Sequence, residues 1–138
     1  MAKTKFSMIN CLFYILIFYF IKCQDSEINE IEYKITPGDG FSDRYKNRGY
    51  IYQKLGNATL ITIASGPKPS SGFYIDVKKI KIKENKVIID VFEGSGSGGK
   101  CDVITYPYVK VRIYKKILPS DIEVINTRNG ENFPPIIS

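Results

Sequence analysis

Residues 73–92 read FYIDVKKIKIKENKVIIDVF, which is two β-prone runs on either side of a polar turn. Within the first run the apolar positions change parity between Val77 and Ile80, so a regular strand would turn its apolar face outward halfway along. A β-bulge near Lys78 and Lys79 would absorb one residue and keep the face inward. The stretch therefore predicts a long, basic strand with a bulge, followed by a hairpin partner.

The same criteria extend the β pattern over most of the chain. The polar turn at 84–86 leads into the second run, in which alternate residues from Val87 to Val91 share one face. A helical period of useful length is absent after residue 23. The alternation predicts four further strands, at 50–54, 60–64, 103–114 and 122–125. We expect an all-β fold, either a small antiparallel β-sandwich or a barrel-like sheet, of about six strands after an N-terminal signal helix.

The N-terminus has the pattern of a signal peptide over residues 1–23. Lysines precede an apolar run, Phe6–Ile21, which is shorter than the roughly 20 residues that cross a bilayer and ends at Lys22. Cleavage after Cys23 would give a secreted or extracytoplasmic protein that starts at Gln24. Cleavage before Cys23 would leave a lipid anchor on that residue, which is the only membrane attachment we expect.

Charge and cysteine content agree with an exported protein. Because residues 1–23 carry three lysines and no acidic residue, the formal charge falls from +6 to +3 on the mature chain. This surplus is too small and too dispersed for a nucleic-acid binder. Only Cys101 remains if cleavage follows Cys23, so the fold would not depend on an internal disulfide. Cleavage upstream of Cys23 would make a bridge between Cys23 and Cys101 possible.

The mature chain is long enough for one domain with one core. We interpret 24–47 as a poorly ordered leader, because it is acidic and then rich in Gly, Asp and Ser, although one short edge strand is compatible with the alternation at Ile31, Tyr33 and Ile35. The β domain spans 48–131, and 132–138 is expected to be a flexible tail.

The residues for common catalytic chemistry are missing. The chain contains no histidine, which excludes a Ser-His-Asp triad and an imidazole metal site, so we expect a protein that is not an enzyme and has no cofactor. The segment Gly94–Lys100 matches nucleotide-binding glycine patterns, but a strand follows where those patterns need a helix, so no nucleotide is expected. A serine-lysine pair around Lys68 would need a buried lysine.

Other polar residues have ordinary interpretations as well as functional ones. Asp90, Glu93 and Asp102 could bind calcium, although their spacing fits no calcium loop and solvated hairpin charges explain them equally. The lysines at 78–86 suggest either an acidic partner or the protection of an edge strand. Asn57 is a turn residue that would carry a glycan only in a eukaryotic secretory route.

Two segments of the domain resemble a known family. Gly66–Val77 reads GPKPSSGFYIDV, and Val103–Val111 reads VITYPYVKV. In this order they resemble the C-terminal domain of PrcB-type protease complex subunits, over about residues 48–131. The family has Thr and Gly where this chain has Ser70 and Ser71, and a longer N-terminal portion. The resemblance implies a non-catalytic accessory subunit that associates with an exported protease and helps to assemble or stabilise it.

The turn before residue 74 is the expected site of contact with a protein partner. Two prolines limit the entropy lost on docking, a glycine allows unusual backbone angles, and an exposed aromatic residue is a common interface anchor. Equally, Phe73 could be the first core residue of its strand. The predicted site consists of Pro67, Pro69, Ser70, Ser71, Gly72, Phe73 and Tyr74.

Two other functions remain open. The same turn and the glycine loop resemble two exposed loops of chagasin-like cysteine-protease inhibitors, although a chain without tryptophan lacks their third loop motif. The ten tyrosines offer stacking faces for a structural or glycan-contacting surface protein.

Overall fold

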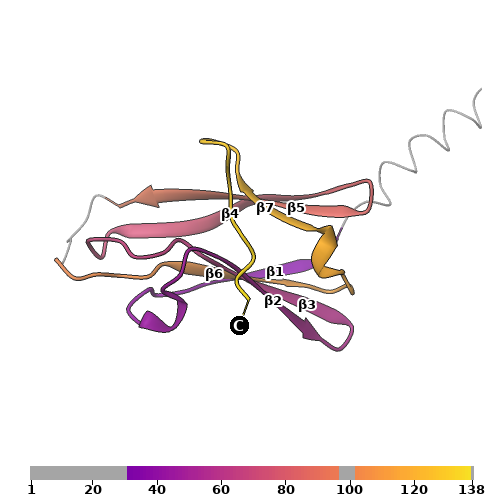
Figure 1. The fold of residues 1–138 in the computed structure, drawn as a ribbon, viewed down its shortest axis with the longest axis horizontal. Coiled ribbons are helices and arrows are strands. Elements are labelled where there is room, and N and C mark those ends of the chain that lie inside the picture. Colours follow the sequence, from indigo (N-terminus) through magenta and orange to yellow (C-terminus); the bar gives the residue numbers. More distant parts are fainter. Residues whose placement is uncertain (1–30, 97–101, 138) are drawn as a thin grey trace, which may run out of the picture. The chain divides into compact units, whose positions relative to one another are not determined.

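A computed structural model describes residues 31–96 and 102–137, and these residues form an all-β fold (Figure 1). Two separate four-stranded sheets have the orders β1-β6-β3-β2 and β4-β5-β7-β8. We call them the first and second sheets. The strands are β1 (Tyr33–Pro37), β2 (Gly49–Leu55), β3 (Ala58–Ala64), β4 (Phe73–Lys83), β5 (Lys86–Ser95), β6 (Tyr108–Ile113), β7 (Ile122–Asn126) and β8 (Glu131–Asn132), with 3-10 turns η1 (Asp43–Tyr45) and η2 (Pro119–Asp121).

The expected signal helix, Cys23 and Cys101 lie outside the described residues. Within the described ranges, no helix has the length and apolarity needed to cross a membrane.

Both predicted hairpins are confirmed. β2 pairs with β3 across the Gly56-Asn57 turn, where Gly56 supplies a φ of 58°. β4 pairs with β5 across Glu84-Asn85, whose φ angles of 52° and 67° are those of a type I′ turn. The predicted bulge is also confirmed, because the β4–β5 register shifts between Val77 and Lys79.

One strand pair departs from the expected antiparallel arrangement. β5 and β7 are parallel, with Val87 opposite Ile122 and Asp90 opposite Ile125. Parallel neighbours need a long connection between them. Here the connection leaves the second sheet, passes through β6 in the first sheet and returns by η2.

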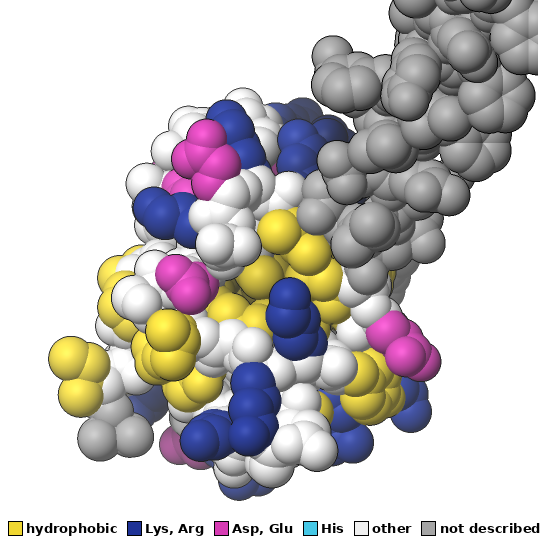
Figure 2. Space-filling view, turned by 90° about the vertical axis from the view of Figure 1, so that its right-hand side faces the viewer, with side chains coloured by type: hydrophobic (Ala, Val, Ile, Leu, Met, Phe, Trp, Pro, Cys, Tyr) yellow, Lys and Arg dark blue, Asp and Glu magenta, His cyan; other side chains and the backbone are white. Residues whose placement is uncertain are grey.

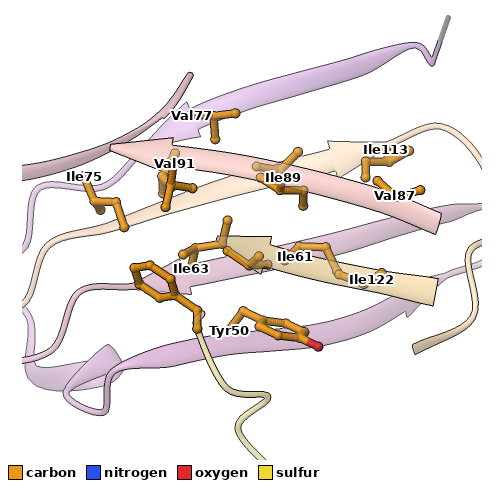
Figure 3. Close-up of a cluster of buried hydrophobic side chains, with 14 of the residues drawn as sticks. Tyr50, Ile61, Ile63, Ile75, Val77, Val87, Ile89, Val91, Ile113 and Ile122 are labelled. Atoms are coloured by element: carbon orange, nitrogen blue, oxygen red, sulfur yellow. The ribbon is translucent and has the colours of Figure 1, made fainter. Parts of the chain in front are cut away.

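The core is a layer of aliphatic side chains between the two sheets (Figure 3). The predicted inward face of β6 is confirmed, since Val109, Val111 and Ile113 are fully buried. Ile61 and Ile63 of β3 belong to the same buried cluster. At about 25 cal/mol per Å² of apolar surface removed from water, this layer is the main source of stability.

Two segments that we expected to be loosely ordered are part of the fold. Within the interpreted leader, β1 pairs with β6 over five residues, from Tyr33 opposite Ile113 to Pro37 opposite Val109. The short alternating run forms a strand because β6 supplies backbone hydrogen bonds along its length.

The segment after β8 differs from the expected flexible tail as well. Phe133 is 3% exposed, and its amide donates to the Val124 carbonyl. The Tyr50 amide then donates to the Pro134 carbonyl at 2.9 Å, and the Ile136 amide to the Tyr50 carbonyl at 2.8 Å. Residues 133–136 therefore run from the second sheet to the first, as the yellow segment in Figure 1 shows.

Candidate partner-binding rim

The turn between β3 and β4 is fastened to its neighbours by backbone hydrogen bonds. The Lys68 amide donates to the Thr105 carbonyl at 2.8 Å, and the Thr105 amide donates back at 3.0 Å. The Thr105 hydroxyl donates to the Ser70 carbonyl at 2.8 Å, and the Gly96 amide to the Gly72 carbonyl at 2.6 Å. These bonds hold the turn in one conformation, which lowers the entropy cost of binding a partner.

The seven predicted site residues all lie within 67–74, in this turn and at the start of β4. Phe73 is half-buried, outside the hydrophobic core, with the Lys68 ammonium 5.7 Å from its ring centroid. Tyr74 is 46% exposed and packs edge-to-face on Phe92, with the ring centroids 6.0 Å apart. Pro67 and Pro69 are exposed, whereas Ser70, Ser71 and Gly72 are half-buried.

Beside the turn, Arg48 joins the two sheets and the β7–β8 hairpin. Its guanidinium donates to both carboxylate oxygens of Glu93, at 2.9 and 2.8 Å, to Glu131 at 2.6 Å and to the Ser65 carbonyl at 3.0 Å. The same group lies 4.3 Å from the centroid of the Phe133 ring. A fork-to-fork pair of this kind is short and directional.

The electrostatics of Glu93 follow from this arrangement. Burial raises the pKa of Glu93, but hydrogen bonds and attraction from Arg48, with contributions from Ser65 and Lys68, outweigh burial and lower it below 4.5. The buried Ser65 hydroxyl has no hydrogen-bond partner among the described residues, so Arg48 is the main cause of the lowered pKa of Glu93. The pKa of Arg48 is raised, chiefly by its hydrogen bond to Glu93 and against the effect of burial. Both groups are therefore charged at neutral pH.

The turn and these charges line an open cleft of about 770 Å³. A smaller hollow of about 500 Å³ adjoins it along Phe73, Tyr74 and Ser95. We call the turn 66–74 and the two hollows together the rim. Glu93 is neutralised by Arg48, and the Lys68 ammonium lies 3.6 Å from the same carboxylate. Arg128 has no carboxylate partner among the described residues, so the rim offers one free cation beside exposed aromatic and proline surface.

Sequence reasoning missed Arg48, Arg128 and Glu131 as parts of this site. Arg48 lies at the start of the ordered domain, 45 residues from Glu93 and 83 from Glu131. A local pattern cannot connect such positions. Arg48 stands just before the predicted strand at 50–54, and nothing in that position distinguishes it from the neighbouring Arg44.

The alternative chemistries can be placed on the structure. The Asp90 carboxylate accepts from the Thr127 amide at 3.2 Å and from its hydroxyl at 3.0 and 2.9 Å, whereas Glu93 faces Arg48. No group of three potential ligands that could hold a metal ion occurs in 31–96 and 102–137. Most of the glycine segment lies outside the described residues, and residues 102–113 beyond it contain no helix.

The lysine-rich strand β4 is the outer strand of the second sheet, as the edge-protection interpretation of its lysines requires. Lysines 78–83 therefore lie on a strand with an unpaired edge, where their charge opposes pairing with other chains.

Comparison with known proteins gives one match of note. The chain is 30% identical over 86 residues to an uncharacterized protein of the archaeon Methanocaldococcus jannaschii. The match covers 62% of this chain and 52% of the relative, so the chain spans about half the length of that protein. No family model and no solved structure matches.

Proposed function

We propose that this chain is an exported, non-catalytic accessory protein that binds a protein partner through the rim. The observation that carries the proposal is the geometry of the turn 66–74. Its backbone is fixed by bonds to Thr105 and Gly96, while Pro67, Pro69 and Tyr74 remain exposed. A fixed backbone lowers the entropy cost of docking, and exposed aromatic residues are common interface anchors.

We further propose that the partner is an exported protease. This part rests on the resemblance of the turn and of residues 103–111 to PrcB-type subunits. The free cation of Arg128 beside Tyr74 suits a partner surface that presents a carboxylate next to an apolar group. The protein would then act by holding or assembling the protease.

The test is co-purification of partners from the exported fraction with a tagged chain. Tyr74→Ala should weaken capture of the partner about tenfold or more, because interface anchors contribute about 2 kcal/mol or more. Tyr114→Ala is a matched control, since Tyr114 is 47% exposed at the far end of β6 from the turn. Figure 2 looks at that opposite end, where hydrophobic side chains lie among basic, acidic and uncharged polar ones.

Equal loss of binding in the two variants, with unchanged melting temperatures, would place the contact elsewhere. One observation favours the inhibitor alternative. The Gly96 amide donates to the Gly72 carbonyl, so the turn and the beginning of the glycine segment, the two loops that this alternative uses, lie side by side. Inhibition of a papain-like protease by the purified protein, lost in a variant of this turn, would favour that alternative.

A further inference from the structure

The outer face of the first sheet carries a group of cations that the rim does not involve. In β1 and β6 the inward residues Ile35 and Val111 pack against the core, so strand alternation directs Lys34 and Arg112 to the outside. Lys34 is directly opposite Arg112, and Thr36 is directly opposite Lys110. Three positive charges are thereby placed on two adjacent strands.

These residues form a hollow of about 280 Å³ in the outer surface. Its lining contains three cations, one hydroxyl group and one aliphatic side chain, but no carboxylate. No ion pair within the described ranges joins any of the three cations to an acidic residue. The lining is Lys34, Thr36, Leu60, Lys110 and Arg112.

The arrangement has an electrostatic cost in the free protein. Like charges directly opposite each other on neighbouring strands are destabilising. Lys110 is also held in place, since its ammonium lies 5.5 Å from the ring centroid of Tyr45 and 5.9 Å from that of Tyr108. The two rings pack on each other at 4.5 Å. A bound anion would relieve the repulsion without a rearrangement of Lys110.

We propose that this hollow binds a tetrahedral oxyanion of the phosphate or sulfate type. The Arg112 guanidinium would supply paired donors, the two lysines point charges and the Thr36 hydroxyl a further donor, which is the combination that recognises such groups. The volume accommodates one such group with part of a molecule that carries it. The site is separate from the rim, so either proposal can fail without the other.

The test is a titration of the purified exported chain with inorganic phosphate and with sulfate, at constant ionic strength, followed by backbone amide NMR. Saturable shifts should centre on Thr36, Lys110 and Arg112. Arg112→Gln or Lys110→Gln should each weaken binding about tenfold, the effect of one lost charge-assisted hydrogen bond. The matched control, Lys79→Gln with Lys81→Gln, removes two lysines from β4 and should change affinity less than about twofold.

Shifts that do not saturate, or a control that loses as much affinity as the hollow variants, would overturn the proposal. A second titration with polyphosphate identifies the source of the oxyanion. Tighter binding per phosphate group than for the free ion, lost in the same variants, would identify a polymer. Equal binding per group would identify a single small ion.

Discussion

Arg48 and the cations of the outer hollow carry the same charge but differ in their surroundings. Arg48 faces the carboxylates of Glu93 and Glu131 and lies over the Phe133 ring. Lys34 and Arg112 face each other, with no carboxylate in the lining of their hollow. The charge of Arg48 therefore helps to close the fold, whereas the three outer cations have no carboxylate beside them. Four measurements test this difference.

The largest effect is expected at Phe133, the aromatic ring on which Arg48 lies. Phe133→Ala removes a side chain that is 3% exposed, so it should lower the free energy of unfolding by about 3–5 kcal/mol. Urea denaturation measures the change. Tyr33→Ala is a control with 43% exposure and should cost much less. If Phe133→Ala lowered the free energy of unfolding as little as Tyr33→Ala, residues 133–136 would not be part of the cooperative fold.

Removal of Arg48 should have the next largest effect. Arg48→Ala leaves the Glu93 carboxylate, whose side chain is 15% exposed, without its partner, and should cost about 2–4 kcal/mol. Arg48→Lys keeps the positive charge but loses the paired hydrogen bonds to the two oxygens of Glu93, so it should retain more stability than Arg48→Ala but less than the unsubstituted protein. A double-mutant cycle with Glu93→Gln isolates the pair. No coupling energy in that cycle would remove the structural role assigned to Arg48.

Low pH should weaken the pair of Arg48 and Glu93, because the Glu93 carboxylate becomes protonated. It should not change the charge of the outer hollow, whose lining contains no carboxylate. Because the folded-state pKa of Glu93 lies below 4.5, the unfolded chain takes up its proton more readily. The stability contributed by Glu93 is present above pH 4.5 and is lost as the pH falls through the lower folded value. Denaturation midpoints at several pH values should show a smaller acid dependence in Glu93→Gln. An unchanged dependence would contradict the pairing.

The smallest effect is expected for Arg112→Gln. The side chain is exposed and opposes Lys34, so its removal should change the stability by no more than about 0.5 kcal/mol, in the stabilising direction if repulsion dominates. Thermal denaturation in buffer without phosphate or sulfate measures this. A loss comparable with that of Arg48→Ala would show that the outer cations are structural too.

Much of the fold is predictable from local patterns. The parity change between Val77 and Ile80 predicts the bulge, and the alternation from Val109 to Ile113 predicts the buried face of β6. Strand periodicity reports which face is buried, because burial is what selects apolar side chains. The proline, glycine and aromatic content of residues 67–74 predicts them as a contact site for a partner, and this stays a prediction.

Features that depend on the path of the chain were not predictable in this way. The parallel pairing of β5 with β7 follows from where the connection returns, which a local pattern does not encode. Arg48 contacts Glu93 and Glu131 across 45 and 83 residues of sequence, which no local pattern spans. Residues 133–136 contain two prolines and suggested a loose tail, yet a buried Phe133 and two hydrogen bonds with Tyr50 fix them.

The bonds between Tyr50 and residues 134–136 also bear on how the domain folds. They join positions more than 80 residues apart, as does the contact of Arg48 with Glu131. Loop-closure entropy must be overcome before such contacts contribute, so folding should be slow, in the range of about milliseconds to seconds typical of β proteins with non-local pairing. During synthesis, the β2 end of the first sheet stays open until residue 136 has left the ribosome. A nascent chain shorter than this therefore remains incompletely folded along that edge of the sheet.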